Sequence, residues 1–128
     1  MMIGLGIDII DNRRIQKTID RFGNKFIEKY FSMNEINKSN QRKNSVNYFA
    51  KRYAAKEACA KALGTGFSKR INWKDIEIMN DMNGKPYINL YNNALRRLKE
   101  ISNKECNILL SLSDEKNYSI ANVSIFEL

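Results

Sequence analysis

The N-terminal residues have the alternating pattern of a β-strand. The apolar positions are Ile3, Leu5, Ile7 and Ile9, and their spacing of two predicts a strand with one apolar face. The opposite face carries Gly4, Gly6 and Asp8. Because two glycines leave that face without side chains just before Asp8, another backbone or a ligand can approach closely there.

Short helices are expected to follow the first strand. A helical period covers residues 13–22 and residues 25–30, which predicts two helices in succession. Ser32 and Glu35 have the spacing of a capping box, which predicts the start of a third short helix. Residues 38–47 are polar, so we expect them to form a loop.

The longest predicted helix begins at Asn44 or Ser45, both of which are good N-cap residues. It ends at Leu63, where the following Gly64 suits the left-handed position that terminates a helix. Many of its residues are alanines. Alanine favours the helix, and its small side chain lets neighbouring elements pack close to the helix axis.

The second half of the chain is predicted to be richer in strands. Asn83-Gly84 is a strong hairpin signal. The elements expected here are strands over residues 76–78, 87–90, 107–112 and 118–126, and an amphipathic helix over residues 91–101. In the last strand Ser119, Ala121, Val123 and Ile125 share one face. These elements predict an α+β fold, a single domain over residues 1–128 with a mostly antiparallel sheet around one long central helix.

The charge balance favours an anionic partner. The chain has 128 residues, with 22 Lys plus Arg against 14 Asp plus Glu and a formal net charge of +8. Hydrophobic residues make up 43%, which fits a packed core and excludes a disordered chain. A net positive charge attracts nucleic acid, an anionic membrane surface, a polyphosphate cofactor or an acidic protein, and charge alone does not choose among them.

Several classes of site are excluded by residue types that the chain lacks. It contains no histidine, and its only cysteines, Cys59 and Cys106, are far apart in sequence, so a zinc site is not expected. Such cysteines are typical of small buried side chains in a reducing compartment. The N-terminus has no signal-peptide pattern, and no apolar run is long enough to cross a membrane. We therefore expect a cytoplasmic protein.

Three charged residues are the strongest chemical signal. Glu57 and Lys61 lie four residues apart on the long predicted helix; alone, such a pair is typical of a surface ion pair. If Asp8 converges on Glu57, the two carboxylates can hold a hard cation, and their oxygen ligands favour Mg²⁺ over zinc. The positive charges of Arg52, Lys56 and Lys61 and the backbone N–H groups of Gly64-Thr65-Gly66 would then suit phosphoryl transfer.

These residues also resemble the motifs of a known family. Gly6-Ile7-Asp8 resembles the Gly-x-Asp motif of the 4′-phosphopantetheinyl transferases, and residues 56–61 resemble their Lys-Glu-Ala-x-x-Lys motif. The following Ala-Leu-Gly-Thr-Gly at residues 62–66 and the hairpin at residues 83–86 are similar to the small holo-(acyl carrier protein) synthase branch. The resemblance covers essentially the whole chain.

The resemblance implies an enzyme of fatty acid biosynthesis. Such an enzyme moves 4′-phosphopantetheine from coenzyme A to a serine of apo-acyl carrier protein and releases adenosine 3′,5′-bisphosphate. It implies that Asp8 and Glu57 bind Mg²⁺ and that Lys61 stabilises charge on the phosphate. The proton acceptor for the serine is left open between Glu57 and a metal-bound water. The implied coenzyme A contacts are Arg52, Gly64, Thr65, Gly66, Asn83, Gly84, Lys85 and Pro86, with Arg42 as a further phosphate partner.

The family resemblance also implies an assembly and a second protein partner. Its small members form homotrimers with active sites at subunit interfaces. The helix that corresponds to their carrier-protein docking helix carries Arg13, Arg14, Lys17 and Arg21, and this basic face complements an acidic acyl carrier protein. Many relatives have a histidine where this chain has Leu109, so a mechanism that requires that imidazole is not expected here. Ser111 and Asp114 are expected to line the site.

A small basic nucleic-acid-binding domain is the alternative from another functional class. Tyr48, Phe49 and Tyr53 lie among basic residues and would serve as stacking surfaces for bases. Their helical spacing instead favours a place in the core. The enzyme hypothesis therefore predicts neither a nucleic acid nor a membrane partner.

Overall fold

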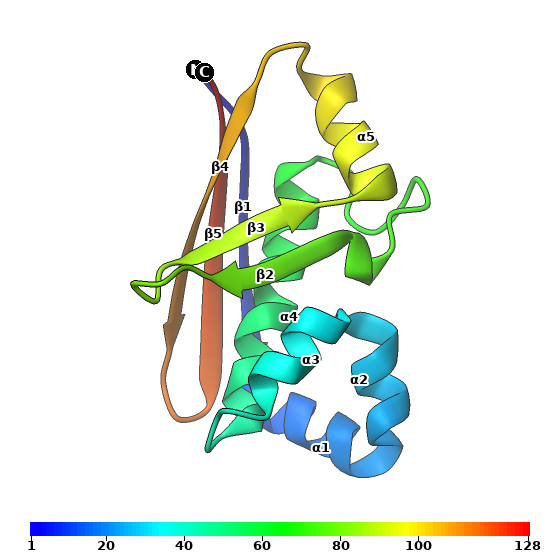
Figure 1. Ribbon diagram of the computed structural model, residues 1–128, viewed down its shortest axis with the longest axis vertical. Helices are drawn as coiled ribbons and strands as arrows, with labels where there is room; N and C mark the ends of the chain where they lie inside the picture. Colours follow the sequence, from blue (N-terminus) through cyan, green and yellow to red (C-terminus); the bar gives the residue numbers. More distant parts are fainter.

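The computed structural model describes residues 1–128 and confirms the α+β class (Figure 1). Its elements follow the order β1 (Met2–Asp11), α1 (Asn12–Phe22), α2 (Asn24–Tyr30), α3 (Met33–Ser39), α4 (Ser45–Ala62), a 3₁₀ turn (Trp73–Asp75), β2 (Ile76–Asn80), β3 (Pro86–Leu90), α5 (Asn92–Ile101), β4 (Cys106–Asp114) and β5 (Tyr118–Glu127). No helix is both long enough and apolar enough to span a bilayer. The expected loop over residues 38–47 is shorter, because α3 continues to Ser39.

The strands pair antiparallel throughout, but they form two sheets rather than one. A three-stranded sheet has the order β1-β5-β4, and β2 with β3 forms the predicted hairpin. The two chain ends lie side by side at one end of the larger sheet (Figure 1), where the Glu127 amide donates to the Met1 carbonyl at 2.9 Å. Both sheets lie against α4, which forms the centre of the core.

Helix α4 is positioned by its caps and by its small residues. The Asn44 side chain accepts a hydrogen bond from the Asn47 amide and starts the helix, as predicted. Ala54, Ala55, Ala58 and Ala60 are completely buried. These alanines let strands from both sheets pack against one helix, so that charged residues of α4 can face residues from distant parts of the chain.

The faces of β1 are the reverse of the usual strand pattern. A Cβ at Gly6 would lie only 1.9 Å from the Ala58 carbonyl oxygen, and a Cβ at Gly4 would lie 2.4 Å from the Ala62 carbonyl oxygen. The glycine face is therefore the buried one, and the backbone that approaches it closely is α4. Leu5, Ile7 and Ile9 face away from the core, each about 60% exposed.

These exposed residues belong to a larger apolar surface on the three-stranded sheet. In the antiparallel register Ile9 pairs with Ile120, and Leu5 and Leu109 both pair with Ser124, so their side chains share one face. We call Leu5, Ile7, Ile9, Leu109 and Ile120 the outer apolar face; all five are exposed. The buried face of β5 consists of Ser119, Ala121, Val123 and Ile125, as the alternation predicts.

Candidate active site

Asp8 and Lys61 meet where β1 crosses the last turn of α4. The Lys61 ammonium donates to Asp8 Oδ1 at 3.0 Å and to the Ile7 carbonyl at 3.0 Å. The glycines of β1 make this contact possible, since they bring the strand against the helix backbone. Lys61 therefore pairs with Asp8 across 53 residues of sequence rather than with Glu57 on its own helix.

The Glu57 carboxylate lies in the same neighbourhood. Burial raises the pKa of Glu57, and the charge of Asp8 raises it further, while Lys61 and Arg14 act in the opposite direction. Glu57 also lies one helical turn before Lys61 on α4, and Lys61 bonds Asp8. The structure thus brings together the two predicted metal ligands, with Lys61 and Arg14 beside them. We call Asp8, Glu57 and Lys61 the carboxylate–lysine centre.

The donor atoms of this centre suit a hard cation such as Mg²⁺. Both candidate ligands are hard carboxylate oxygens, and no group of three or more His, Cys, Asp or Glu side chains gathers anywhere in the structure. Mg²⁺ characteristically takes one or two carboxylates and leaves its other positions for phosphate oxygens and water. The like-charge repulsion that raises the pKa of Glu57 is the repulsion that a cation between the two carboxylates would relieve.

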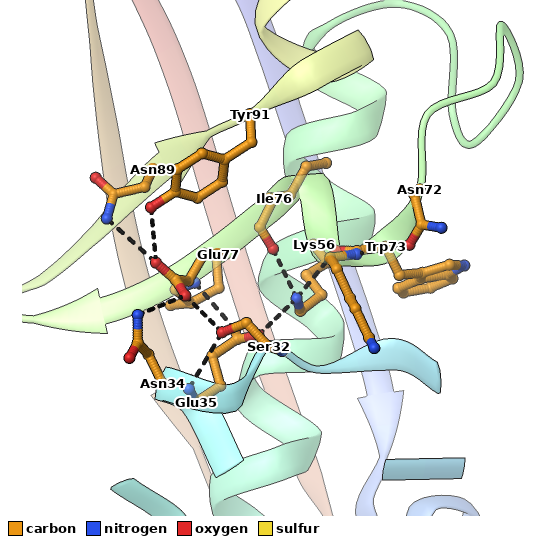
Figure 2. Close-up of polar contacts among 12 residues, drawn as sticks. Ser32, Asn34, Glu35, Lys56, Asn72, Trp73, Ile76, Glu77, Asn89 and Tyr91 are labelled. Carbon is orange, nitrogen blue, oxygen red and sulfur yellow. Dashed lines mark hydrogen bonds and ion pairs between the residues drawn. The ribbon is translucent and has the colours of Figure 1, made fainter. Parts of the chain in front are cut away.

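Lys56, expected to add positive charge to the site, lies elsewhere (Figure 2). Its ammonium is completely buried and donates to Glu35 Oε1 at 2.8 Å, to the Trp73 carbonyl at 3.0 Å and to the Ile76 carbonyl at 2.6 Å. All three N–H donors are used. Burial lowers the pKa of Lys56, and Glu35 opposes that shift. The expectation for Lys56 is therefore wrong, because this lysine faces the opposite side of α4 and ties it to α3 and β2.

The Gly64-Thr65-Gly66 turn begins three residues after Lys61, but its amides are not free donors. The Gly64 amide donates to the Lys61 carbonyl at 2.9 Å, and the Thr65 and Gly66 amides donate to the Ala60 carbonyl at 3.4 and 3.1 Å. The Thr65 hydroxyl donates to the Gly66 carbonyl at 2.9 Å. The prediction that this turn supplies N–H groups to a phosphate is wrong, since those groups already cap α4.

A second set of predicted residues lies around Arg52, in a separate hollow. The hollow has a volume of about 450 Å³ and includes Arg42, Lys43, Arg52, Asn80 and Gly84 in its lining. It contains neither Asp8 nor Glu57 nor Lys61. One chain therefore carries the carboxylate–lysine centre and this basic hollow at two different places.

Arg52 is a buried cation with one unused hydrogen-bond donor. Its guanidinium stacks 3.7 Å above the Tyr48 ring and donates through Nη2 to Asn80 Oδ1. The residue is only 4% exposed, and its Nε is a buried donor without a partner. Burial lowers the pKa of Arg52. A buried cation with an unused donor is costly unless an anion completes it.

The other predicted hairpin residues lie beside this hollow, in the turn between β2 and β3. The Asn83 and Lys85 amides donate to Asp81 Oδ1 at 2.8 and 2.9 Å, which closes the turn. Pro86 begins β3 opposite Asn80. Asp114, expected to line the site, is also part of the hollow and accepts a long bond of 3.4 Å from Asn47.

The basic residues of α1 gather as predicted. Arg13, Arg14, Lys17 and Arg21 line one open hollow of about 530 Å³. Arg13 is partly neutralised, since its guanidinium donates to both oxygens of Asp11 at 2.9 and 2.7 Å and lowers the pKa of Asp11 to about 2. The basic charge available to a partner therefore comes mainly from Arg14, Lys17 and Arg21.

An apolar hollow beside this basic face was not predicted. It has a volume of about 390 Å³ and is lined by Arg14, Ile15, Thr18, Phe22, Lys25, Phe26, Lys29, Tyr30 and Tyr53. The sequence signal for this hollow is the apolar side of residues 13–22. The same pattern is equally typical of side chains packed in a core. Arg14 borders both hollows, and Tyr53, one helical turn before Glu57 on α4, lines the apolar one, so the basic face of α1 lies near the carboxylate–lysine centre.

Two further expectations concern β4 and the aromatic residues of α4. Leu109, at the position of the missing histidine, is 42% exposed and belongs to the outer apolar face. Ser111 lies on the same face of β4 and is exposed.

The aromatic residues of α4 are packed inside the molecule. Tyr48 and Phe49 are buried in the core, and Tyr53 stacks on Trp73 with ring centroids 4.6 Å apart. The stacking surface that a nucleic-acid-binding domain needs is therefore not supported.

Comparison with known proteins gives a single answer. The model of the 4′-phosphopantetheinyl transferase superfamily matches residues 4–123. A holo-[acyl-carrier-protein] synthase of Parvibaculum lavamentivorans is 49% identical over 117 residues, which cover 90% of this chain and 88% of that protein. Two crystal structures of such synthases are also similar. The one from Neisseria meningitidis has a TM-score of 0.87 at 36% identity and covers 99% of this chain and 100% of that one.

The second structure carries a ligand. It is a holo-(acyl-carrier-protein) synthase of Bacillus anthracis in complex with CoA (3′,5′-ADP), with a TM-score of 0.82 at 35% identity, covering 100% of this chain and 99% of that one. The motifs that carry the resemblance, Gly6-Ile7-Asp8 and residues 56–61, lie within the matched residues and meet at the carboxylate–lysine centre. This chain belongs to the 4′-phosphopantetheinyl transferase superfamily.

Proposed function

We propose that this chain transfers 4′-phosphopantetheine from coenzyme A to a serine of apo-acyl carrier protein, giving holo-acyl carrier protein and adenosine 3′,5′-bisphosphate. The observation that carries the proposal is the meeting of Asp8, Glu57 and Lys61 across the β1–α4 contact. The relatives named as holo-[acyl-carrier-protein] synthases support it. Such a transfer serves fatty acid biosynthesis.

Asp8 and Glu57 are the proposed ligands of Mg²⁺. When bound, the cation neutralises charge on the coenzyme A pyrophosphate and polarises the phosphorus that is attacked. Lys61 lies 3.0 Å from Asp8 and is proposed to stabilise the charge that develops on the phosphate oxygens. The candidates for the group that takes the proton of the attacking serine hydroxyl are Glu57 and a water on the metal. The chain has no histidine to do so.

We propose a homotrimer with an active site at each subunit interface. Two observations support an assembly in which neighbouring copies complete each other's site. The outer apolar face of Leu5, Ile7, Ile9, Leu109 and Ile120 is exposed in one chain, and an exposed apolar surface of this kind marks an interface. In addition, the buried, incompletely bonded Arg52 lies apart from the carboxylate–lysine centre. A neighbour's Arg52 hollow would supply the cation for a coenzyme A phosphate.

The carrier protein is proposed to dock on α1. Arg14, Lys17 and Arg21 form a basic hollow that complements an acidic carrier protein. The adjacent apolar hollow gives the same partner a place for apolar side chains. Because Arg14 borders both hollows and lies near Glu57, a carrier protein docked there would present its serine to the carboxylate–lysine centre.

A direct assay tests the proposal. The protein is incubated with coenzyme A, Mg²⁺ and an apo-acyl carrier protein, and the carrier is then weighed by mass spectrometry. We expect a mass gain of one phosphopantetheine that requires both coenzyme A and Mg²⁺. A carrier that keeps its apo mass, under conditions in which a known synthase modifies it, would overturn the proposal.

A further inference from the structure

Helix α5 holds the loop between α4 and β2 at three points. The Arg97 Nε donates to the Leu63 carbonyl at 2.9 Å, the Asn93 amide group donates to the Arg70 carbonyl at 2.9 Å, and the Asn92 amide group donates to Asp75 Oδ1 at 3.1 Å. Figure 1 shows α5 lying beside this loop. The loop contains the Gly64-Thr65-Gly66 turn, which begins three residues after Lys61.

The Arg97 contact acts on the end of α4 itself. The last carbonyls of a helix lack partners within the helix, and an arginine that donates to one of them also complements the helix dipole. The Arg97 side chain is only 20% exposed, and its Nη1 lies 3.4 Å from Glu100 Oε2, which helps to orient the guanidinium. A Cβ at Gly64 would lie 3.4 Å from Arg97 Nη2, so the guanidinium lies directly against the turn.

The loop that α5 holds does not have a relaxed backbone. Lys69 and Arg70 are consecutive non-glycine residues with φ of 55° and 62°, a left-handed conformation that persists only where the surroundings fix it. Asn93 fixes the Arg70 carbonyl, and Phe67 stacks on Trp73 with ring centroids 3.8 Å apart. Backbone held in this way is typical of functional segments.

We propose that Arg97 is a positioning residue for coenzyme A, which holds the Leu63 carbonyl and thereby the Gly64–Gly66 turn in the conformation that contacts the cofactor. The inference rests on the proposed function and on the contact between this turn and coenzyme A that the family resemblance implies. Because the turn's amides cap α4, its shape, rather than free N–H groups, is what the cofactor meets.

The test compares Arg97→Gln with Arg96→Gln, a matched control at the neighbouring exposed position of α5. Coenzyme A affinity is measured by calorimetry with Mg²⁺, and amide hydrogen exchange at Thr65 and Gly66 is measured without ligand. Loss of a charged hydrogen bond predicts affinity about tenfold weaker and amide exchange about tenfold faster in Arg97→Gln. The kcat for transfer and the KM for carrier protein should stay within about twofold of the control. Arg97→Lys, which keeps a donor for the Leu63 carbonyl, should recover most of the affinity.

Coenzyme A affinity in Arg97→Gln equal to that of Arg96→Gln would overturn the inference, whatever the exchange rates. An equal loss of affinity and kcat would also overturn it, since that pattern indicates a general loss of the site. If Arg97→Gln does not fold, Arg97→Met, which keeps the aliphatic part of the side chain but has no donor for the Leu63 carbonyl, is compared with Arg96→Met by the same criteria. Calorimetry keeps the two proposals apart: a wild-type chain that binds coenzyme A but transfers nothing contradicts the proposed function alone.

Discussion

The two lysines of the motif over residues 56–61 are predicted to have different roles: Lys56 stabilises the fold, and Lys61 acts in phosphopantetheine transfer. The variant Lys56→Met tests this difference. The variant removes the ammonium that bonds Glu35 and two carbonyls (Figure 2). The Glu35 carboxylate stays buried and keeps only the N–H bonds from Ser32 at 2.8 Å and Ile78 at 3.0 Å. Removing one partner of a buried ion pair costs about 3–5 kcal/mol.

The size of the loss follows from these contacts. The retained N–H bonds to Glu35 reduce the cost, and the Trp73 carbonyl keeps the Ile76 amide as a donor. Loss of the ammonium from the Ile76 carbonyl adds to the cost, so we expect about 4 kcal/mol. For a chain of this length that corresponds to a fall in Tm of roughly 10–20 °C. The double variant Lys56→Met with Glu35→Gln removes the uncompensated charge and should recover at least half of the loss.

Denaturant unfolding measures the stability of each variant, and the transfer assay measures its activity. Both start from a temperature and buffer in which every variant is folded, so together they separate the two roles. The double variant should transfer phosphopantetheine at a rate within about threefold of wild type, since Lys56 does not face the carboxylate–lysine centre. In Lys61→Met the rate of transfer should fall about 100-fold or more. The Tm of this variant should stay within a few degrees of wild type, because the ion pair of Lys61 is half exposed. A Lys56→Met variant of full stability that no longer transfers would refute the reasoning.

Three further predictions concern β1 and the residues around it. Gly6→Ala should cost about 1–3 kcal/mol or more and abolish transfer, because the new Cβ would lie 1.9 Å from the Ala58 oxygen; normal Tm and turnover would contradict the close packing of β1 on α4. Because the folded-state pKa of Glu57 is raised, its contribution to stability is present at low pH and lost as pH rises through that pKa. Asp8→Asn should lower this pKa in an NMR titration, and an unchanged pKa would mean that the carboxylates are not neighbours. Ile7→Glu should convert the proposed trimer to monomers in sedimentation velocity; an unchanged sedimentation coefficient would exclude the outer apolar face as the interface.

The sequence predicted the elements well where local signals act. The capping box of Ser32 and Glu35 and the N-cap at Asn44 are both present, since a cap depends on residues three positions apart. The alternation in β1 was equally clear, but alternation does not reveal which face is buried. Close packing of Gly4 and Gly6 on α4 decides that, and it depends on Ala58 and Ala62, which are more than 50 positions away in the sequence.

The part of the site that could be predicted from the sequence is the part that lies within short motifs. Asp8, Glu57 and Lys61 do converge, as the motifs imply. The motif could not reveal that Lys56 is buried, because its partner Glu35 comes from another helix. Nor could it reveal that the Gly64–Gly66 amides are used within the chain, since the same glycine pattern caps a helix and approaches a ligand.

The most direct test of the central claim is the rate of holo-carrier formation by wild type and by Asp8→Asn and Glu57→Gln at equal concentrations of folded protein. The account predicts that wild type converts apo-carrier to holo-carrier in the presence of coenzyme A and Mg²⁺. The rate of holo-carrier formation should fall by about 100-fold or more in both variants, while the fold, followed by circular dichroism, is unchanged. Wild-type protein without transfer, or either variant within about threefold of wild type, would contradict the account.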